Sequence, residues 1–163
     1  MIRTILVTVA VSTLGCSASL SNPEQQHSHV TVTRLRAEPY SFMYYSPLLK
    51  AERLVIRDDA AWHVAWASLY SNAVPMPAPP NVDFTQEMVV FVALGQRPTG
   101  GYSILVDSAA TGASGLTVWV GTVSPGVRCG TSQALTQPVD IARIARIDAA
   151  VHFVDVPKVI DCP

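Results

Sequence analysis

Hydrophobic residues in this chain gather into short runs, separated by polar, glycine-containing or proline-containing stretches. Runs of roughly four to eight residues that are rich in β-branched side chains are typical of β-strands. Such runs lie at residues 30–35, 51–56, 87–94, 102–106, 116–120, 138–144 and 149–155. We therefore expect an α+β fold with a mostly antiparallel β-sheet of about seven strands.

One segment has a helical period instead. Trp62, Trp66 and Leu69 recur at a spacing that places their side chains on one face of a helix. Asp58 or Asp59 precedes them and can accept hydrogen bonds from the free amides of a helix N-terminus. The pattern predicts one helix over residues 59–70, and it favours packing of the tryptophans in the core over a ligand platform.

Residues 95–103 connect two of the predicted strands and have the most informative local sequence. Pro98 fixes φ and has no amide proton, so it suits a position that donates no hydrogen bond to a sheet. Gly100 and Gly101 permit positive φ, which a tight connection needs. We therefore predict that these residues close a β-hairpin between residues 87–94 and 102–106.

The same connection carries the candidate binding residues, which are Arg97, Thr99, Gly100, Gly101 and Tyr102. Arg97 and Thr99 are expected to point outward. An arginine side chain offers donors in a fixed fork that suits a carboxylate or carbonyl oxygens. The alternatives are that Arg97 is a solvated surface charge and that Tyr102 packs inward as a strand residue.

Residues 91–104, with the sequence FVALGQRPTGGYSI, resemble the signature of the PrcB C-terminal domain family. That family takes its name from a subunit of a bacterial surface protease complex. Similarity extends to the flanking elements, at residues 53–58, 62–66, 79–90, 137–141 and 151–154. The resemblance covers most of residues 34–162, and it implies the fold and an association with a protease complex. It brings no catalytic residues with it.

The N-terminus has the organisation of an export signal. Arg3 precedes an uncharged segment at residues 4–13, which is too short for a membrane-spanning helix of roughly 20 apolar residues. The leader then ends in a lipobox-like sequence whose Cys16 would receive the lipid. We expect a signal peptide at 1–16, a flexible tether at 17–29 and a single PrcB-C-like domain at 30–163.

The lipobox has one departure, because Thr13 stands where leucine is usual. The alternative is an ordinary secretory leader cut after Ser19, which would give a soluble periplasmic or secreted protein. Ser17 follows the cysteine, in place of the aspartate that signals retention at the inner membrane. The resemblance therefore implies an anchor in the outer membrane, with the domain facing the periplasm.

The cysteines agree with export. If lipid takes Cys16, Cys129 and Cys162 remain as an even pair in an oxidising compartment. A disulfide between them would close a loop of about 34 residues and contribute about 3–4 kcal/mol by the chain-entropy model. Two free thiols are the alternative.

Composition and motifs narrow the function classes. Only 14% of residues are charged and the net charge is −1, so we expect no nucleic-acid binding through clustered basic residues. The sequence has no CxxC or HxxxH spacing, and we expect neither a metal nor a cofactor. It has no GxSxG elbow, and a triad of Ser103, His152 and Asp83 could arise by chance. We expect no catalytic residues and no enzyme activity.

These observations predict an exported, lipid-anchored, non-catalytic domain that binds another protein of the cell envelope or surface. A role beside a protease follows from the family resemblance alone. One alternative is a domain that binds a small ligand or a peptidoglycan fragment through residues 95–103. Another is a structural or folding accessory.

Overall fold

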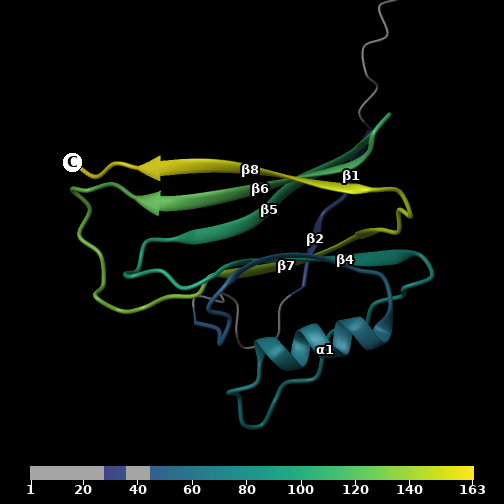
Figure 1. Cartoon of the computed structure of the whole chain (residues 1–163), viewed down its shortest axis with the longest axis horizontal. Coiled ribbons are helices and arrows are strands. Elements are labelled where there is room, and N and C mark those ends of the chain that lie inside the picture. Colours follow the sequence, from purple (N-terminus) through teal and green to yellow (C-terminus); the bar gives the residue numbers. More distant parts are fainter. Residues whose placement is uncertain (1–27, 36–44) are drawn as a thin grey trace, which may run out of the picture.

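The computed structural model describes residues 28–35 and 45–163, which form three layers (Figure 1). The outer sheet has the strand order β1-β5-β6-β8, and the middle sheet has the order β2-β7-β4-β3. Helix α1 (Asp59–Leu69) covers the free face of the middle sheet. The strands are β1 (Ser28–Val30), β2 (Thr33–Arg34), β3 (Ala51–Ile56), β4 (Glu87–Leu94), β5 (Ser103–Gly112), β6 (Gly115–Pro125), β7 (Val139–Ala145) and β8 (Val151–Ile160).

The predicted α+β class is confirmed, but the described residues contain eight strands instead of about seven. The segment predicted as one strand at 30–35 is divided between two sheets, because residues 31–32 carry the chain from β1, beside β5, to β2, beside β7. β1 begins at Ser28, inside the predicted tether. The rest of that tether, the predicted signal peptide and Cys16 lie outside the described residues.

Strand β4 is buried on both faces and belongs to two hydrophobic cores. Val90 and Val92 pack between the two sheets, whereas Val89 and Phe91 pack toward α1. A strand covered on both sides shows a continuous apolar run in place of alternation. This explains why residues 87–94 contain the longest hydrophobic run of the domain.

Helix α1 forms as its periodicity predicts. The Asp58 side chain accepts a hydrogen bond from the Ala61 amide at 2.8 Å and caps the N-terminus. Trp62 and Trp66 are each only 1% exposed, and their indole N–H groups donate to the carbonyl oxygens of Pro80 and Pro77. The two tryptophans therefore fix the helix to the sheet and also hold the proline-rich segment that follows it.

Strand β8 pairs in parallel with β6 and forms one edge of the outer sheet. It continues through Pro157 to Ile160, because a proline without an amide proton is tolerated on an edge strand. Parallel pairing brings the C-terminal ends of β6 and β8 together, with Pro125 opposite Ile160. The predicted disulfide between Cys129 and Cys162 joins the chain just beyond these two ends.

A buried carboxylate joins the two sheets where the chain leaves the outer sheet after β1. Asp140, on β7, is 8% exposed and accepts a hydrogen bond from the Val106 amide at 2.8 Å. Arg34 donates to the Val106 carbonyl at 2.9 Å and lies 3.5 Å from the Asp140 carboxylate. Val106 adjoins a register shift in β5, so these side chains satisfy backbone groups that lie beyond the end of β1.

Candidate functional site

The predicted hairpin at residues 95–103 is not formed. β4 lies in the middle sheet and β5 in the outer sheet, so this segment crosses from one sheet to the other. The physical reason is that both edges of β4 are already paired, with β3 on one side and β7 on the other. β5 therefore pairs with β6 and β1 in the second layer.

The backbone of this crossing segment is held by residues 132–136. Arg97 and Thr136 exchange two backbone hydrogen bonds, of 2.8 and 3.1 Å, and the Thr136 hydroxyl donates to the Thr99 carbonyl at 2.8 Å. The Gly100 amide donates to the Ser132 carbonyl at 3.0 Å. Thr136 is only 3% exposed, so a buried polar residue holds the crossing segment in place through these hydrogen bonds.

The sequence predicts that the side chain of Arg97 points outward, but in the structure this side chain is half-buried. Its guanidinium donates to the Leu94 carbonyl at 2.9 Å and lies 5.9 Å from the centre of the Tyr102 ring. Its Nε atom is buried and has no hydrogen-bond partner among residues 28–35 and 45–163. Thr99 is also half-buried and donates to the Gly100 carbonyl. These contacts use the arginine to brace its own segment, and a binding role for the five predicted residues stays a prediction.

The glycine prediction is correct for one of the two positions. Gly101 has a φ of 86°, and Gly95 at the start of the segment has a φ of 73°. Gly100 does not have positive φ. An added Cβ at this position would collide with the Ser132 hydroxyl, which would have to rotate away.

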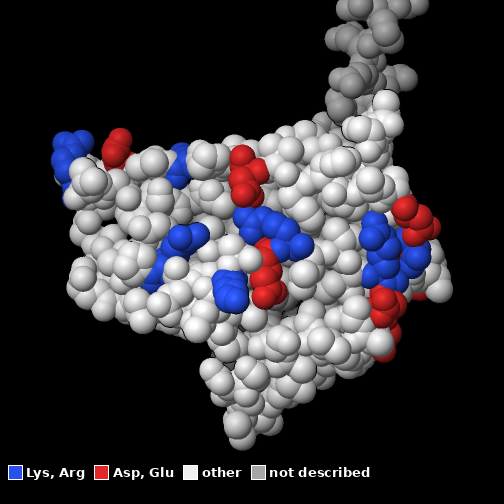
Figure 2. Space-filling view, in the orientation of Figure 1, with Lys and Arg blue, Asp and Glu red and all other residues white. Residues whose placement is uncertain are grey.

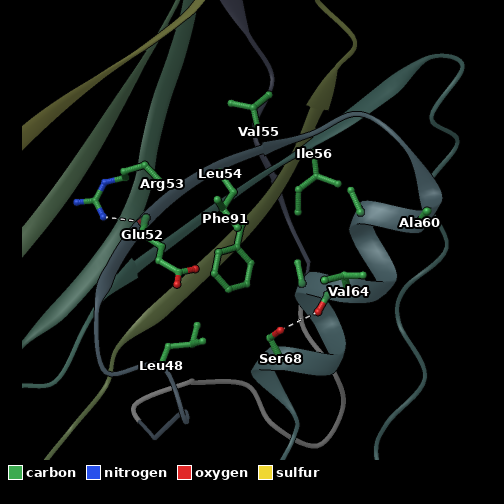
Figure 3. Close-up of a pocket in the computed structure, with 12 residues that line it drawn as sticks. Leu48, Glu52, Arg53, Leu54, Val55, Ile56, Ala60, Val64, Ser68 and Phe91 are labelled. Atoms are coloured by element: carbon green, nitrogen blue, oxygen red, sulfur yellow. Dashed lines mark hydrogen bonds between the residues drawn. The ribbon is translucent and has the colours of Figure 1, made fainter.

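The described residues form a groove at another place, between strand β3 and helix α1 (Figure 3). The groove has a volume of about 650 Å³. Phe91 lies at its base, and small side chains on the helix keep it open. The helix residues that line it are Ala60, Ala61, Val64, Ala65 and Ser68. Val64 is 68% exposed and Leu54, on the opposite wall, is 38% exposed, so the groove presents apolar surface to solvent.

Side chains of β3 alternate between the groove and the space between the sheets. Ile56 packs with the core below α1, so Glu52 and Leu54, at alternate positions, share its face. Arg53 is on the opposite face and forms an ion pair of 2.8 Å with Asp155 on β8. In Figure 3 the Glu52 carboxylate points into the groove, and Arg53 points away from it. Glu52 makes no ion pair or side-chain hydrogen bond with any of the described residues.

Charge elsewhere gives no stronger site. On the face shown in Figure 2, Lys and Arg side chains are interspersed with Asp and Glu, and no large area has one sign. Within residues 28–35 and 45–163, no group of three or more His, Cys, Asp or Glu side chains could hold a metal ion. Nor does any helix in these ranges have the length and apolar character needed to cross a membrane.

The structure does not assemble the triad written from the sequence. His152 lies opposite Thr117 on β6, and Ser103 lies opposite Val123 on the same strand. Six residues of a strand span ~20 Å. Asp83 accepts hydrogen bonds from the side chains of its own turn. These three residues therefore have no common site.

Sequence reasoning missed the groove. The alternation of Glu52, Leu54 and Ile56 and the small residues at 60–61 are visible in the sequence. They do not reveal that β3 is an edge strand, or that α1 lies along it. Strand order depends on contacts between residues far apart in the chain.

Comparison with known families supports part of the resemblance. The model of the PrcB C-terminal family matches residues 88–145, which run from β4 to the end of β7 and include the crossing segment. β3, α1 and β8 lie outside the match. Searches of curated proteins and of solved structures found no match.

Proposed function

From the match to the PrcB C-terminal family over residues 88–145, we propose that this chain is an exported, lipid-anchored and non-catalytic accessory protein. It binds another protein of the cell envelope, and the family resemblance favours a protease complex as the assembly. The leader-like N-terminus and the disulfide between Cys129 and Cys162 support an oxidising compartment. The groove between β3 and α1 is the observation that carries the binding role.

The groove favours a protein partner over a reaction. Single exposed apolar residues are ordinary on protein surfaces, but contiguous apolar surface in a concave site indicates an interaction. Here Leu54 and Val64 face each other across a groove whose remaining walls are mostly small or apolar. Among the described residues, the Glu52 carboxylate has no ion-pair or side-chain hydrogen-bond partner, whereas catalysis by acid–base groups needs partners within hydrogen-bond distance.

The test is capture of a partner from intact envelopes by chemical crosslinking, followed by mass spectrometry. Val64→Glu places a charge in the groove at an exposed helix position, and we expect at least a tenfold loss of the captured partner. Ala67→Glu is the matched control, because Ala67 is exposed on the same helix but does not line the groove. It should capture as the wild type does. Equal capture by both variants would refute the groove as the binding surface.

The anchor has a separate test. Cys16→Ser should move the protein from the detergent-extracted membrane fraction to the soluble fraction, because a lipidated cysteine is the proposed anchor. Mass spectrometry of the wild type should find the lipid on the mature N-terminus. An unmodified chain that begins after residue 19 would show that the secretory alternative is correct.

A further inference from the structure

We propose that the groove binds an extended segment of the partner, which adds to the middle sheet as a strand beside β3 and places a Lys or Arg side chain against Glu52. This inference rests on the proposed function, and it specifies the chemistry of the bound segment. It follows from the edge of β3 that no described strand occupies, from the shape of the groove, and from the charge of Glu52, which has no ion-pair partner among the described residues.

β3 is the edge strand best suited to pairing with another chain. All six of its residues pair with β4 on one side, and no described strand pairs with the other side. An edge of six residues is ~20 Å long. The other edges are less suited to pairing: β1 and β2 are only three and two residues long, and β8 contains Pro157, which cannot donate a sheet hydrogen bond.

The groove supplies the second requirement of strand addition, which is room for alternate side chains. A segment beside β3 would direct every second side chain toward α1. On that side lie Ala60, Ala61 and Ser68, whose small side chains leave space, and the exposed face of Val64. Apolar residues of the segment would pack there, while the backbone hydrogen bonds to β3 would supply affinity.

Glu52 sets the charge of the segment. A carboxylate that is covered by a bound chain loses solvation, and this is costly unless a cation pairs with it. Arg53 cannot serve, because its guanidinium is bound to Asp155 and to the carbonyl oxygens of Glu52 and Ala93. Lys50 is exposed and forms no ion pair with Glu52. The bound segment must therefore bring the cation, with apolar residues at alternate positions beside it.

The first test selects ligands from a phage-displayed library of random 12-residue peptides on the purified full-length chain. We expect enrichment of peptides that alternate apolar residues with a Lys or Arg. A selected peptide should lose at least tenfold in affinity for the Glu52→Lys variant, and its Lys→Glu counterpart should regain affinity for that variant. Asp107→Lys, an exposed charge change on the outer sheet, is the control and should leave affinity unchanged.

The second test asks whether the peptide binds as a strand. Each backbone amide of a selected peptide is methylated in turn. Strand addition predicts a loss of at least tenfold at alternate positions and little change at the positions between them. Uniform tolerance of methylation, or equal affinity for the wild type and Glu52→Lys, would overturn the proposal. So would a dimer in light scattering that Val64→Glu dissociates, because a second copy would then occupy the groove.

The two levels of the proposal fail separately. If Val64→Glu abolishes capture of the envelope partner but methylation has no positional effect, the proposed function stands and strand addition is wrong. If Val64→Glu captures normally, the groove is not the binding surface and strand addition fails with it; if the wild type captures no envelope protein, the proposed function itself fails.

Discussion

The contacts of Arg97 in the structure indicate a stabilising role for its side chain, in place of the binding role that the sequence suggested. From the sequence it is an exposed fork for an anion, whereas in the structure it donates to the Leu94 carbonyl and lies over the Tyr102 ring. A half-buried arginine that braces a crossing between sheets contributes to stability. A solvated arginine contributes almost nothing.

Arg97→Ala should therefore lower the free energy of unfolding by about 1–2 kcal/mol, from a lost charge-assisted hydrogen bond and a lost cation–π contact. Urea unfolding followed by circular dichroism measures this. Arg128→Ala is the control, because Arg128 is exposed, and its change should stay within about 0.5 kcal/mol. If the two variants lower the free energy of unfolding equally, Arg97 contributes no more to stability than an ordinary surface charge.

Asp83 is the residue whose titration should be visible in stability. Its carboxylate accepts hydrogen bonds from the hydroxyl and the amide of Thr85, at 2.6 and 3.0 Å, and from Gln86 at 3.1 Å. The Thr85 hydroxyl, followed by the Thr85 amide and Gln86, holds the pKa of Asp83 below its usual 3.8. The ionised form therefore stabilises the turn that begins β4.

A group whose pKa is lower in the folded state stabilises above its unfolded pKa and loses this effect as pH falls through its folded pKa. Asp83→Asn should have a lower melting temperature than the wild type at neutral pH. The difference should shrink as the pH falls below 3.8. Melting curves across this range test it, and Thr85→Ala should weaken the same acid dependence. If the difference in melting temperature stays constant down to about pH 2, the hydrogen bonds of ionised Asp83 are not its cause.

At the scale of elements, helix α1 holds the irregular, proline-rich segment that follows it through hydrogen bonds from two tryptophans. Trp62 and Trp66 lie with ring centres 5.1 Å apart, and both donate to carbonyl oxygens of the proline-rich segment. Prolines cannot provide amide donors, so this segment cannot join a sheet. The helix gives it partners that a sheet could not.

Trp66→Phe should cost about 1–3 kcal/mol, because it removes volume from the core and leaves the Pro77 carbonyl without its donor. Trp119→Phe, in the half-buried strand β6, should cost less. Far-ultraviolet circular dichroism is the proper probe, since both changes alter fluorescence. A larger loss of stability for Trp119→Phe would show that the contacts of Trp66 with the proline-rich segment matter less than packing in the outer sheet.

At the scale of the molecule, two four-stranded sheets are held at separate points. Arg34 and Asp140, on the middle sheet, join it to the outer sheet through hydrogen bonds with the Val106 backbone. Arg53 and Asp155 join β3 to β8, and the disulfide closes the end of the outer sheet. The edge strand β8 has exposed side chains along most of its length. It therefore depends more on the disulfide than the central strands do.

The double variant Cys129→Ser, Cys162→Ser should lose about 3–4 kcal/mol of stability relative to the oxidised wild type. Hydrogen exchange should increase most in β8, because that strand loses its tether. Urea unfolding of the reduced wild type should match the variant. Identical unfolding midpoints for the oxidised wild type and the variant would contradict the stabilising role.

The sequence correctly predicted features that depend on local periodicity, and the one pair of cysteines that remains if Cys16 carries the lipid. These include the helix, its tryptophan face, most strand segments and the cysteine pair. It failed where sheet membership decides the outcome. Residues 95–103 have the composition of a hairpin, yet both edges of β4 are taken by strands distant in sequence. The groove was missed for the same reason, because only the strand order makes β3 an edge.

The division of residues 28–34 between two sheets has a consequence for the order of synthesis. Val30 pairs with Ala109 and Thr33 pairs with Arg143. β1 and β2 therefore wait for partners made roughly 80 and 110 residues later, which takes on the order of 4–22 seconds at ~5–20 residues per second. Until those partners have been made, β1 and β2 have no strand to pair with. Neither sheet can be complete before β7 and β8 have been synthesised.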